Sequence, residues 1–457
     1  MNDTSLCLRN IGYLVTCNDK QEILRDIDLN VSDGLIKSIG GSREDGIEEI
    51  DASDWIVFPG LINTHHHFFQ AFIRNQPQFA WPNDVLTWIS RIYPLFSKLT
   101  EPCFYHTALI CMAELIKYGC TTAFDHQYCF PKHAGTRLVD RQIEAARLLG
   151  MRFVAGRGAN TLPASAGGNV PEQMIESTKT FLNDVERLVS LYHSNKLGAM
   201  EQIVVAPCQP VNCWPETFIE SLGLARDKAI QLHTHLGEGE SSVMAQRYGK
   251  RTVDWMELQG LYGSDIWVAH AWELDAREIT HLGELEIGVS HCPAPIFLVG
   301  EEITDLPTMM ASDMRIGLGV DGCASNDNSN LAECIRNAYL LQCLVASQRG
   351  HRAPDPSDYL SLATRGGAAL LGREDIGDLS VGKCADLFAI RKDRLDMVGA
   401  LEAPQAIPAK LGLSGPTALT MIDGRIVWRD GEFPGLDESK LAFEARVELS
   451  RVLDFRG

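Results

Sequence analysis

Histidines stand in this sequence at a spacing that suits a metal site. His65 and His67 form an HxH pair that ends the run at residues 63–67. In extended chain alternate residues point the same way, so His65 and His67 share one face and His66 lies on the other. Neutral imidazole binds zinc and related borderline metals, and an open catalytic site uses about three protein ligands plus water. The pair therefore supplies two of the ligands that one divalent ion needs.

Further candidate ligands and acid–base groups follow later in the chain. His235 ends a second HxH pair, and Glu238 stands just beyond it, where its carboxyl group can face a bound water. His270 and Asp321 each follow a short apolar run, and Asp321 adds a carboxylate to the histidines. A single histidine is more often a hydrogen-bonded structural group than a ligand, but chance rarely produces this combination of spacings. We interpret these side chains as parts of one site.

The elements that must position this site are short runs rich in β-branched residues, which alternate with helical stretches. These runs are residues 55–61, 121–125, 153–156, 203–206, 229–232, 266–269, 287–289 and 316–320. Such alternation implies a parallel sheet, and eight repeats imply closure into a (β/α)₈ barrel with its active site at the carboxyl ends of the strands. We therefore expect residues 59–375 to form a barrel domain with the polar residues gathered at one end.

Both ends of the chain are expected to form antiparallel strands. The first fifty residues contain short alternating segments broken by turn residues. Residues 385–390 and 419–428 also have strand patterns, and Asp423 and Gly424 suit a hairpin turn in the second of them. We expect residues 1–58 and 376–457 to pair into one small β-sandwich domain that is discontinuous in sequence.

Composition excludes several classes of partner. A net charge of -19 and a pI near 5.1 disfavour a nucleic-acid groove or an anionic membrane surface, both of which need clustered Lys and Arg. The first residues lack the pattern of a secretory signal, and charges interrupt the apolar stretches, so we expect a cytoplasmic protein without a membrane span. The 13 cysteines are scattered without CxxC spacing and are expected to be buried thiols. The expected ligand is a small molecule, and the expected assembly is a homodimer.

Longer motifs around these residues resemble a known family. FPGLINTHHH at residues 58–67 resembles the opening signature of the amidohydrolase superfamily. Four further motifs resemble those of its aminohydrolase branch, which includes deaminases of guanine, 8-oxoguanine and pterins. These motifs are HLGE at 235–238, VAH at 268–270, SHCP at 290–293 and GVDG at 319–322. Residues 66–72, 291–300 and 330–336 are most similar to the s-triazine-degrading aminohydrolases of that branch.

The resemblance implies a division of roles. It assigns His65, His67, His235 and Asp321 to one divalent metal, zinc in the first place and iron(II) as the alternative, because both metals accept these ligands. It implies that Asp321 takes a proton from the attacking water, that Glu238 protonates a ring nitrogen, and that His270 hydrogen-bonds near the nucleophile. The implied reaction removes an amino or alkylamino group hydrolytically from a six-membered N-heteroaromatic ring.

The sequence leaves more than one substrate ring open. The resemblance implies that Gln70 faces the ring, and Cys208 and Gln209 follow the fourth strand run, where substrate contacts are expected. Residues 206–210 depart from the triazine-degrading pattern, so a purine-like or pterin-like ring stays open beside a triazine. Stacking on a planar ring is possible for the aromatic side chains Trp81, Trp88, Tyr93 and Trp214.

Two alternative hypotheses belong to other functional classes. Residues 317–322 match GxGxxG, which occurs in dinucleotide-binding oxidoreductases, but a polar loop at 324–328 follows where that motif needs a helix. A barrel that has lost catalysis and serves as an interaction module is the second alternative. For His126 and His291 we expect hydrogen bonds around the site, and for Arg157 either ring recognition or a structural salt bridge.

Overall fold

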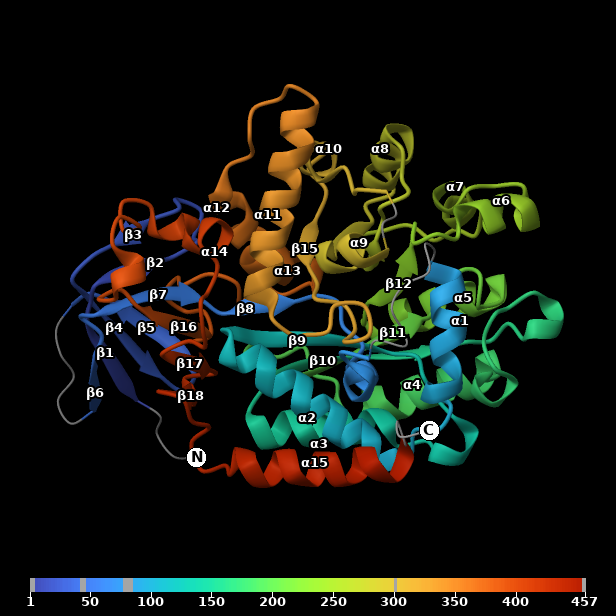
Figure 1. Ribbon diagram of the computed structural model, residues 1–457, viewed down its shortest axis with the longest axis horizontal. Helices are drawn as coiled ribbons and strands as arrows, with labels where there is room; N and C mark the ends of the chain where they lie inside the picture. Colours follow the sequence, from blue (N-terminus) through green and yellow to red (C-terminus); the bar gives the residue numbers. More distant parts are fainter. Residues whose placement is uncertain (1–4, 42–46, 77–84, 300–301, 454–457) are drawn as a thin grey trace.

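A closed barrel of parallel strands forms the centre of the protein. The computed structural model describes residues 5–41, 47–76, 85–299 and 302–453. Barrel strands follow one another in chain order and β15 closes on β8 (Figure 1). The strands are β8 (Leu61–Asn63), β9 (Cys120–Gln127), β10 (Arg152–Ala159), β11 (Glu201–Pro207), β12 (Leu232–Leu236), β13 (Ile266–His270), β14 (Gly288–His291) and β15 (Ile316–Leu318). The predicted (β/α)₈ barrel is confirmed.

Two of the predicted strand runs differ from the structure. The run 55–61 is divided, because β7 (Trp55–Pro59) belongs to an outer sheet and only β8 enters the barrel. Gly60 joins them where the backbone lies so close to Thr121 that any side chain would clash. The run 229–232 starts too early, because Ala229 ends the preceding helix in the left-handed conformation at φ +51°. Apolar composition alone cannot distinguish these neighbouring environments.

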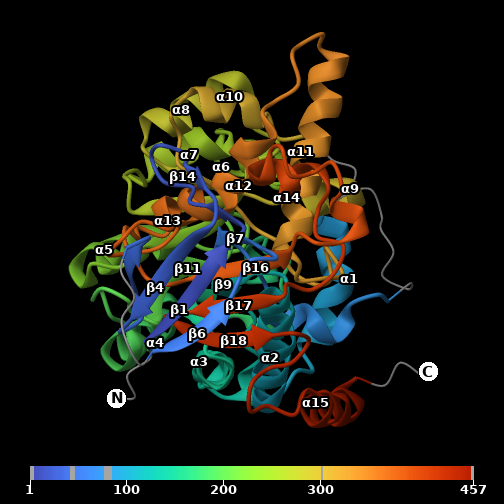
Figure 2. The ribbon, with the colours of Figure 1, turned by 90° about the vertical axis from the view of Figure 1, so that its left-hand side faces the viewer.

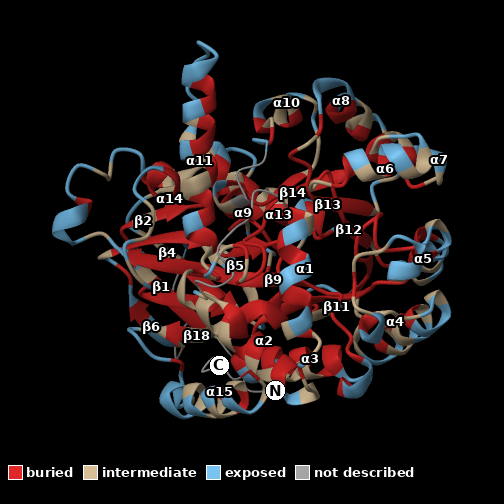
Figure 3. Ribbon diagram, turned by 45° about the vertical axis from the view of Figure 1, so that its right-hand side comes forward, coloured by how far each residue is buried: buried red, intermediate tan, exposed pale blue. Residues whose placement is uncertain are grey.

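Helices cover the outside of the barrel and leave their outer faces exposed (Figure 3). The α-helices are α1 (Val85–Phe96), α2 (Glu101–Lys117), α3 (Leu138–Leu149), α4 (Thr178–Tyr192), α5 (Pro215–Lys228), α6 (Ser241–Tyr248), α7 (Thr252–Leu258), α8 (Ala276–Glu284), α9 (Pro293–Val299), α10 (Leu306–Ala311), α11 (Leu331–Gln348), α12 (Pro356–Ser361), α13 (Gly367–Leu370), α14 (Ile407–Lys410) and α15 (Glu438–Val452). The barrel strands β9 and β10 are buried along their whole length, as expected for strands covered on both faces.

Strands from both ends of the chain form two further sheets beside the barrel (Figure 2). The four-stranded sheet has the order β5-β4-β1-β6 and the six-stranded sheet the order β18-β17-β16-β7-β2-β3. These strands are β1 (Leu6–Ile11), β2 (Tyr13–Val15), β3 (Ile23–Leu24), β4 (Ile27–Ser32), β5 (Leu35–Ile39), β6 (Glu48–Asp51), β16 (Leu387–Arg391), β17 (Leu419–Ile422) and β18 (Arg425–Arg429). The antiparallel pairing of β7 with β16 joins the two ends of the chain.

The alternation of β7 explains how the outer sheets attach to the barrel. Trp55 and Val57 lie in the apolar core between the two sheets, whereas Ile56 and Phe58 join the barrel core. Phe58 stacks on Phe388 with ring centroids 5.1 Å apart. The six-stranded sheet is therefore apolar on both faces.

The C-terminal part of the chain contains an element that the sequence prediction omitted. The range 376–457, expected to be β-structure, also holds α15, which packs against the barrel helix α2 rather than on the outer sheets. All cysteines are free thiols, and all except Cys343 are buried. Within the described ranges, no helix combines the length and apolar character that a membrane crossing requires.

Candidate metal centre and active site

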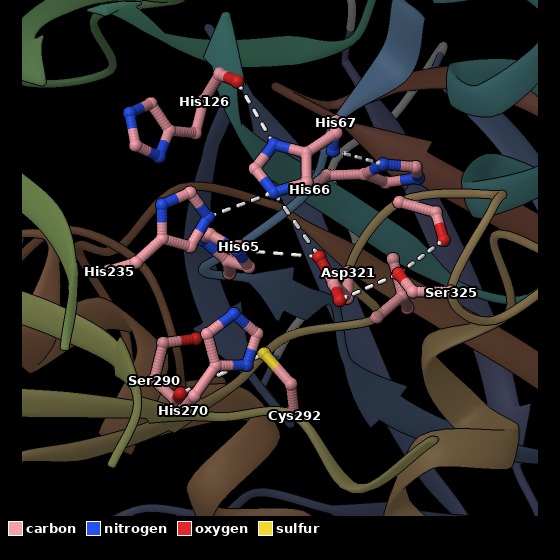
Figure 4. Close-up of polar contacts among 12 residues, drawn as sticks. His65, His66, His67, His126, His235, His270, Ser290, Cys292, Asp321 and Ser325 are labelled. Carbon is pink, nitrogen blue, oxygen red and sulfur yellow. Dashed lines mark hydrogen bonds and ion pairs between the residues drawn. The ribbon is translucent and has the colours of Figure 1, made fainter. Parts of the chain in front are cut away.

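Three histidines and one aspartate converge at the carboxyl ends of the barrel strands (Figure 4). Nε2 of His67 lies 3.1 Å from Nε2 of His235 and 3.3 Å from Oδ1 of Asp321. Nε2 of His65 lies 3.4 Å from the same Asp321 oxygen. Metal–ligand bonds of about 2.0–2.1 Å at tetrahedral angles separate neighbouring ligand atoms by roughly 3.3 Å. The spacing of these atoms therefore suits a small divalent metal.

Hydrogen bonds to main-chain carbonyls fix the tautomers of two histidines. Nδ1 of His67 donates to the carbonyl oxygen of His126 at 3.0 Å, and Nδ1 of His235 donates to that of Cys208 at 2.6 Å. Because a carbonyl oxygen only accepts, each proton sits on Nδ1 and each Nε2 keeps a free lone pair. Both rings thus direct a metal-binding nitrogen at the cluster.

His65 reaches the same state through a second histidine. Nδ1 of His233 donates to the carbonyl oxygen of Trp267 at 3.1 Å, so Nε2 of His233 is an acceptor. Nδ1 of His65 donates to that acceptor at 3.0 Å, which leaves Nε2 of His65 as the free nitrogen. In the sequence, His233 is recognisable only as the first histidine of the HxH pair that ends at His235. Its role depends on Trp267, which is distant in sequence.

Charge and burial favour metal binding. Burial first, and neighbouring histidines second, lower the pKa of His65 and His235 well below the ordinary value, and burial lowers the pKa of His67. The imidazoles are therefore neutral near pH 7, as ligands must be. Nε2 of His65 and Oδ1 of Asp321 are buried without a hydrogen-bond partner among the described residues. Since buried polar atoms are normally satisfied, these atoms fit a metal in the cluster.

Asp321 is held by a serine that the sequence analysis did not single out. The Ser325 hydroxyl donates to Oδ2 of Asp321 at 2.7 Å and leaves Oδ1 facing the histidines. Burial opposes the charged form, but His270, His67 and this hydroxyl lower the pKa of Asp321 below its ordinary value. Asp321 is thus an anion beside neutral histidines.

Glu238 and His270 lie at the edge of the cluster. Oε1 of Glu238 is 3.3 Å from Nε2 of His270. Burial, followed by the charges of Asp321 and Glu240, raises the pKa of Glu238 well above its ordinary value. Burial lowers the pKa of His270 to about 4. The raised pKa of Glu238 favours its protonated form and the lowered pKa of His270 favours the neutral imidazole, which suits a carboxyl group that gives up a proton.

A small cavity opens onto these groups and is lined by the predicted substrate contacts. Its lining includes Gln70, Trp88, Cys208, Gln209, Glu238, Asp321, Tyr93 and Tyr128. The cavity has a volume of 30 Å³, whereas pockets for drug-sized ligands measure about 300–1,000 Å³. Side chains of α1, Trp88 and Tyr93 among them, form part of its lining.

The remaining aromatic candidates have different positions. Trp88 and Tyr93 line the cavity from α1. Trp214 is 41% exposed at the start of α5 and stands apart from the lining residues. Trp81 lies outside the described residues. Stacking on a ring is therefore restricted, among the described candidates, to Trp88 and Tyr93.

Three further polar residues, His126, Arg157 and His291, lie outside the cluster. Nε2 of His126 donates to the carbonyl oxygen of Ala206 at 2.8 Å, in β11 and two residues before Cys208. Arg157 forms ion pairs with Glu176 and Asp184 at 2.8 Å each, so the structural alternative holds for this residue. Both ring nitrogens of His291 are buried without a hydrogen-bond partner among the described residues.

The GxGxxG match has a packing explanation. Gly317 lies against Thr64, and Gly319 lies against His65, where an added Cβ would come within 2.7 Å of the His65 Cβ. Gly322 lies against the Gln70 amide so closely that a side chain would clash. These glycines let residues 317–322 lie close to Thr64, His65 and Gln70, so packing explains the match.

Comparison with known proteins assigns the family. The model of the amidohydrolase family matches residues 56–427, which include every residue of the cluster. The chain belongs to the amidohydrolase family. This amidohydrolase is 52% identical over 462 residues to hydroxydechloroatrazine ethylaminohydrolase of Pseudomonas sp. (strain ADP), covering 98% of this chain and 96% of that protein. It is 37% identical to 8-oxoguanine deaminase of Pseudomonas aeruginosa, covering 93% and 94% of the two chains.

Solved structures agree with the family assignment. Atrazine chlorohydrolase from Arthrobacter aurescens, solved in complex with zinc, superposes on the amidohydrolase with a TM-score of 0.91. The two chains are 26% identical, and the match covers 97% of this chain and 100% of the other. The arrangement of barrel and outer sheets is thus shared along nearly the whole length of both proteins.

Proposed function

We propose that this amidohydrolase removes an amino or alkylamino group hydrolytically from a six-membered N-heteroaromatic ring. The observation that carries the proposal is the placement of Glu238, whose pKa burial raises, beside a cluster of histidines and Asp321. Hydrolysis of an amine from such a ring needs a metal site, a base for water and an acid for the ring nitrogen. Relatives named for ethylaminohydrolase and deaminase activities support the same reaction class.

His65, His67, His235 and Asp321 would hold one divalent metal, for which we propose zinc. The free Nε2 atoms and the unpaired Asp321 oxygen support this ligand set. When bound, a divalent metal lowers the pKa of water from 15.7 to about 7 and so makes hydroxide available at neutral pH. The zinc in the related chlorohydrolase supports zinc over iron(II).

The side chains of this protein would divide the proton transfers. Asp321, an anion with one unpaired oxygen, would accept the proton of the attacking water. Glu238 would give its proton to the ring nitrogen beside the carbon under attack, and neutral His270 would accept a hydrogen bond from the incoming water. Asp321 would then pass the water proton to the amine, which leaves. Glu238 would regain a proton from the new hydroxyl group as the carbonyl forms, so that one water is consumed and one amine is released.

The first ring that we propose is an s-triazine, because the chain is 52% identical to an ethylaminohydrolase that is named for a substrate with such a ring. An oxopurine or pterin is the second candidate, because deaminases named for those rings are 37% and 30% identical. Gln70, Trp88, Cys208 and Gln209 line the cavity that this ring would occupy.

One experiment tests the reaction and the metal together. Purified protein is analysed for metal and then assayed for ammonia and alkylamine release from hydroxyatrazine, melamine-type rings, guanine, 8-oxoguanine and pterins. We expect about one zinc per chain, amine release from at least one ring, and loss of that activity after chelation with recovery on adding zinc. Inertness toward every ring, or activity that survives complete metal removal, would contradict the proposal.

A further inference from the structure

A buried glutamate next to the active site accepts three N–H groups. Glu240 is fully buried, and its two carboxylate oxygens accept the main-chain N–H groups of Gly237 and Glu238 at 2.6 Å each. Oε2 also accepts the side-chain amide nitrogen of Gln209 at 3.5 Å. All three hydrogen-bond partners of this side chain are N–H donors, so its two oxygens act as acceptors in these contacts.

The contact with Glu240 determines which way the Gln209 amide points. An amide has one donor end and one acceptor end, and a carboxylate attracts the donor end. Nε2 of Gln209 is therefore directed at Glu240, which does not line the cavity, whereas Gln209 does. Oε1 of Gln209 accepts no hydrogen bond from the described residues. That oxygen is the amide atom left to a molecule in the cavity.

The second glutamine of the cavity is fixed in the opposite sense. Oε1 of Gln70 accepts the main-chain N–H of Ala324 at 3.0 Å, so its Nε2 is left to donate. The lining of the cavity thus offers one amide donor and one amide acceptor. A cyclic amide presents the complementary pair, a carbonyl oxygen and a ring N–H.

We propose that Gln209, oriented by Glu240, is a specificity-determining residue that accepts a hydrogen bond from a ring N–H and so selects rings in the lactam form. This inference rests on the proposed function, because it concerns the ring that the same cavity would take. Rings with an N-alkyl group, a halogen or an alkoxy group at that edge lack the donor. They would leave the buried Gln209 oxygen without a partner, which costs binding free energy.

The test measures binding, so that it does not depend on turnover. Two ligand pairs without an amino group are titrated calorimetrically into the metal-loaded full chain: 1,3,5-triazine-2,4,6-trione with its N-trimethyl derivative, and hypoxanthine with 1-methylhypoxanthine. For the preferred scaffold we expect the N–H member to bind roughly tenfold more tightly than the N-methyl member.

Variants distinguish the effect of the hydrogen bond on affinity from the steric effect of the methyl group. In Gln209→Leu the preference should fall to near unity, because affinity for the N–H member is lost while the steric effect of the methyl group stays. Glu240→Gln should narrow the preference too, since a neutral amide no longer dictates the orientation of Gln209. Gln231→Leu is the matched control, because Gln231 precedes β12 and bonds to the carbonyl oxygen of Leu370, away from the cavity.

The outcomes distinguish this inference from the proposed function. A preference that persists unchanged in Gln209→Leu, or wild-type protein that binds no member of either pair, would overturn the specificity role. An unchanged preference in folded Glu240→Gln would overturn the orienting role of Glu240. If Glu240→Gln does not fold, as judged by circular dichroism, Gln209→Leu still tests whether Gln209 determines specificity. If the preference for the N–H member changes in Gln209→Leu but the wild type releases no amine from any ring, the proposed reaction is contradicted and the selection of lactam rings is supported.

Discussion

Oε1 of Glu238 lies 3.3 Å from Nε2 of His270, at the edge of the cluster formed by the histidines and Asp321. Burial raises the pKa of Glu238 well above its ordinary value and lowers the pKa of His270 to about 4, so burial disfavours an ion pair between the two side chains. A carboxyl group in this state can deliver a proton to a ring nitrogen, which an aspartate in water could not do as readily.

Replacing the proton donor should remove activity and spare the metal. Glu238→Gln keeps the shape of the side chain but has no acidic proton, so we expect kcat to fall by about 10²- to 10⁴-fold. Steady-state kinetics and metal analysis check this, with the exposed Glu220→Gln as the control. A Glu238→Gln variant as fast as the wild type would exclude Glu238 as the acid.

Removing one predicted ligand should release the metal. His67→Ala deletes a nitrogen that lies 3.3 Å from Asp321, and we expect substoichiometric zinc and loss of activity. His133→Ala changes an exposed histidine and should retain both. Metal content is measured by atomic emission after dialysis. Full zinc occupancy in His67→Ala, at the affinity of the wild type, would contradict the ligand assignment.

His233 should affect the metal indirectly, through His65. His233→Phe keeps the bulk of the ring but removes the acceptor for Nδ1 of His65, so we expect metal affinity to fall about 10- to 100-fold. His233→Gln can restore an acceptor and should recover part of the affinity. Competition with a zinc chelator measures both values. Equal affinity in the phenylalanine variant and the wild type would show that this hydrogen bond does not orient His65.

Asp125 should make stability depend on pH. Burial raises the pKa of Asp125 to about 8, although Phe68 N–H and the Gln142 amide donate to its oxygens. Its unfolded value is about 3.9, so the folded state binds more protons between roughly pH 4 and pH 8. The unfolding free energy should therefore fall as pH rises through this window, by about 1.4 kcal/mol per unit at most.

Asp125→Asn isolates this effect. Asparagine can still accept the Phe68 N–H, and a turned Gln142 amide can accept from asparagine, because Oε1 of Gln142 has no partner among the described residues. Urea unfolding of the metal-loaded protein at pH 5 and pH 8 should show a smaller loss of stability in the variant. A loss as large as that of the wild type would mean that Asp125 is not the titrating group.

The outer elements show where sequence patterns are insufficient. Residues 55–61 have one continuous apolar pattern, yet Trp55 to Pro59 pair with β16 and only Leu61 to Asn63 enter the barrel. Strand patterns report burial and not the identity of the partner strand. Helix α15 was missed because the surrounding strands suggested a purely β region, while its attachment comes from packing on α2.

The sequence by itself determined the barrel and the residue types of the site. Alternating strand and helix patterns are local, and the HxH spacing puts His65 and His67 on one side whatever the rest of the chain does. Only the tertiary structure decided which hydrogen-bond partners and neighbours those residues have. His233 donates to the carbonyl oxygen of Trp267, Gln209 donates to Glu240, and α1 contributes to the lining of the cavity. Each of these depends on segments far apart in sequence meeting at one end of the barrel, which no local pattern encodes.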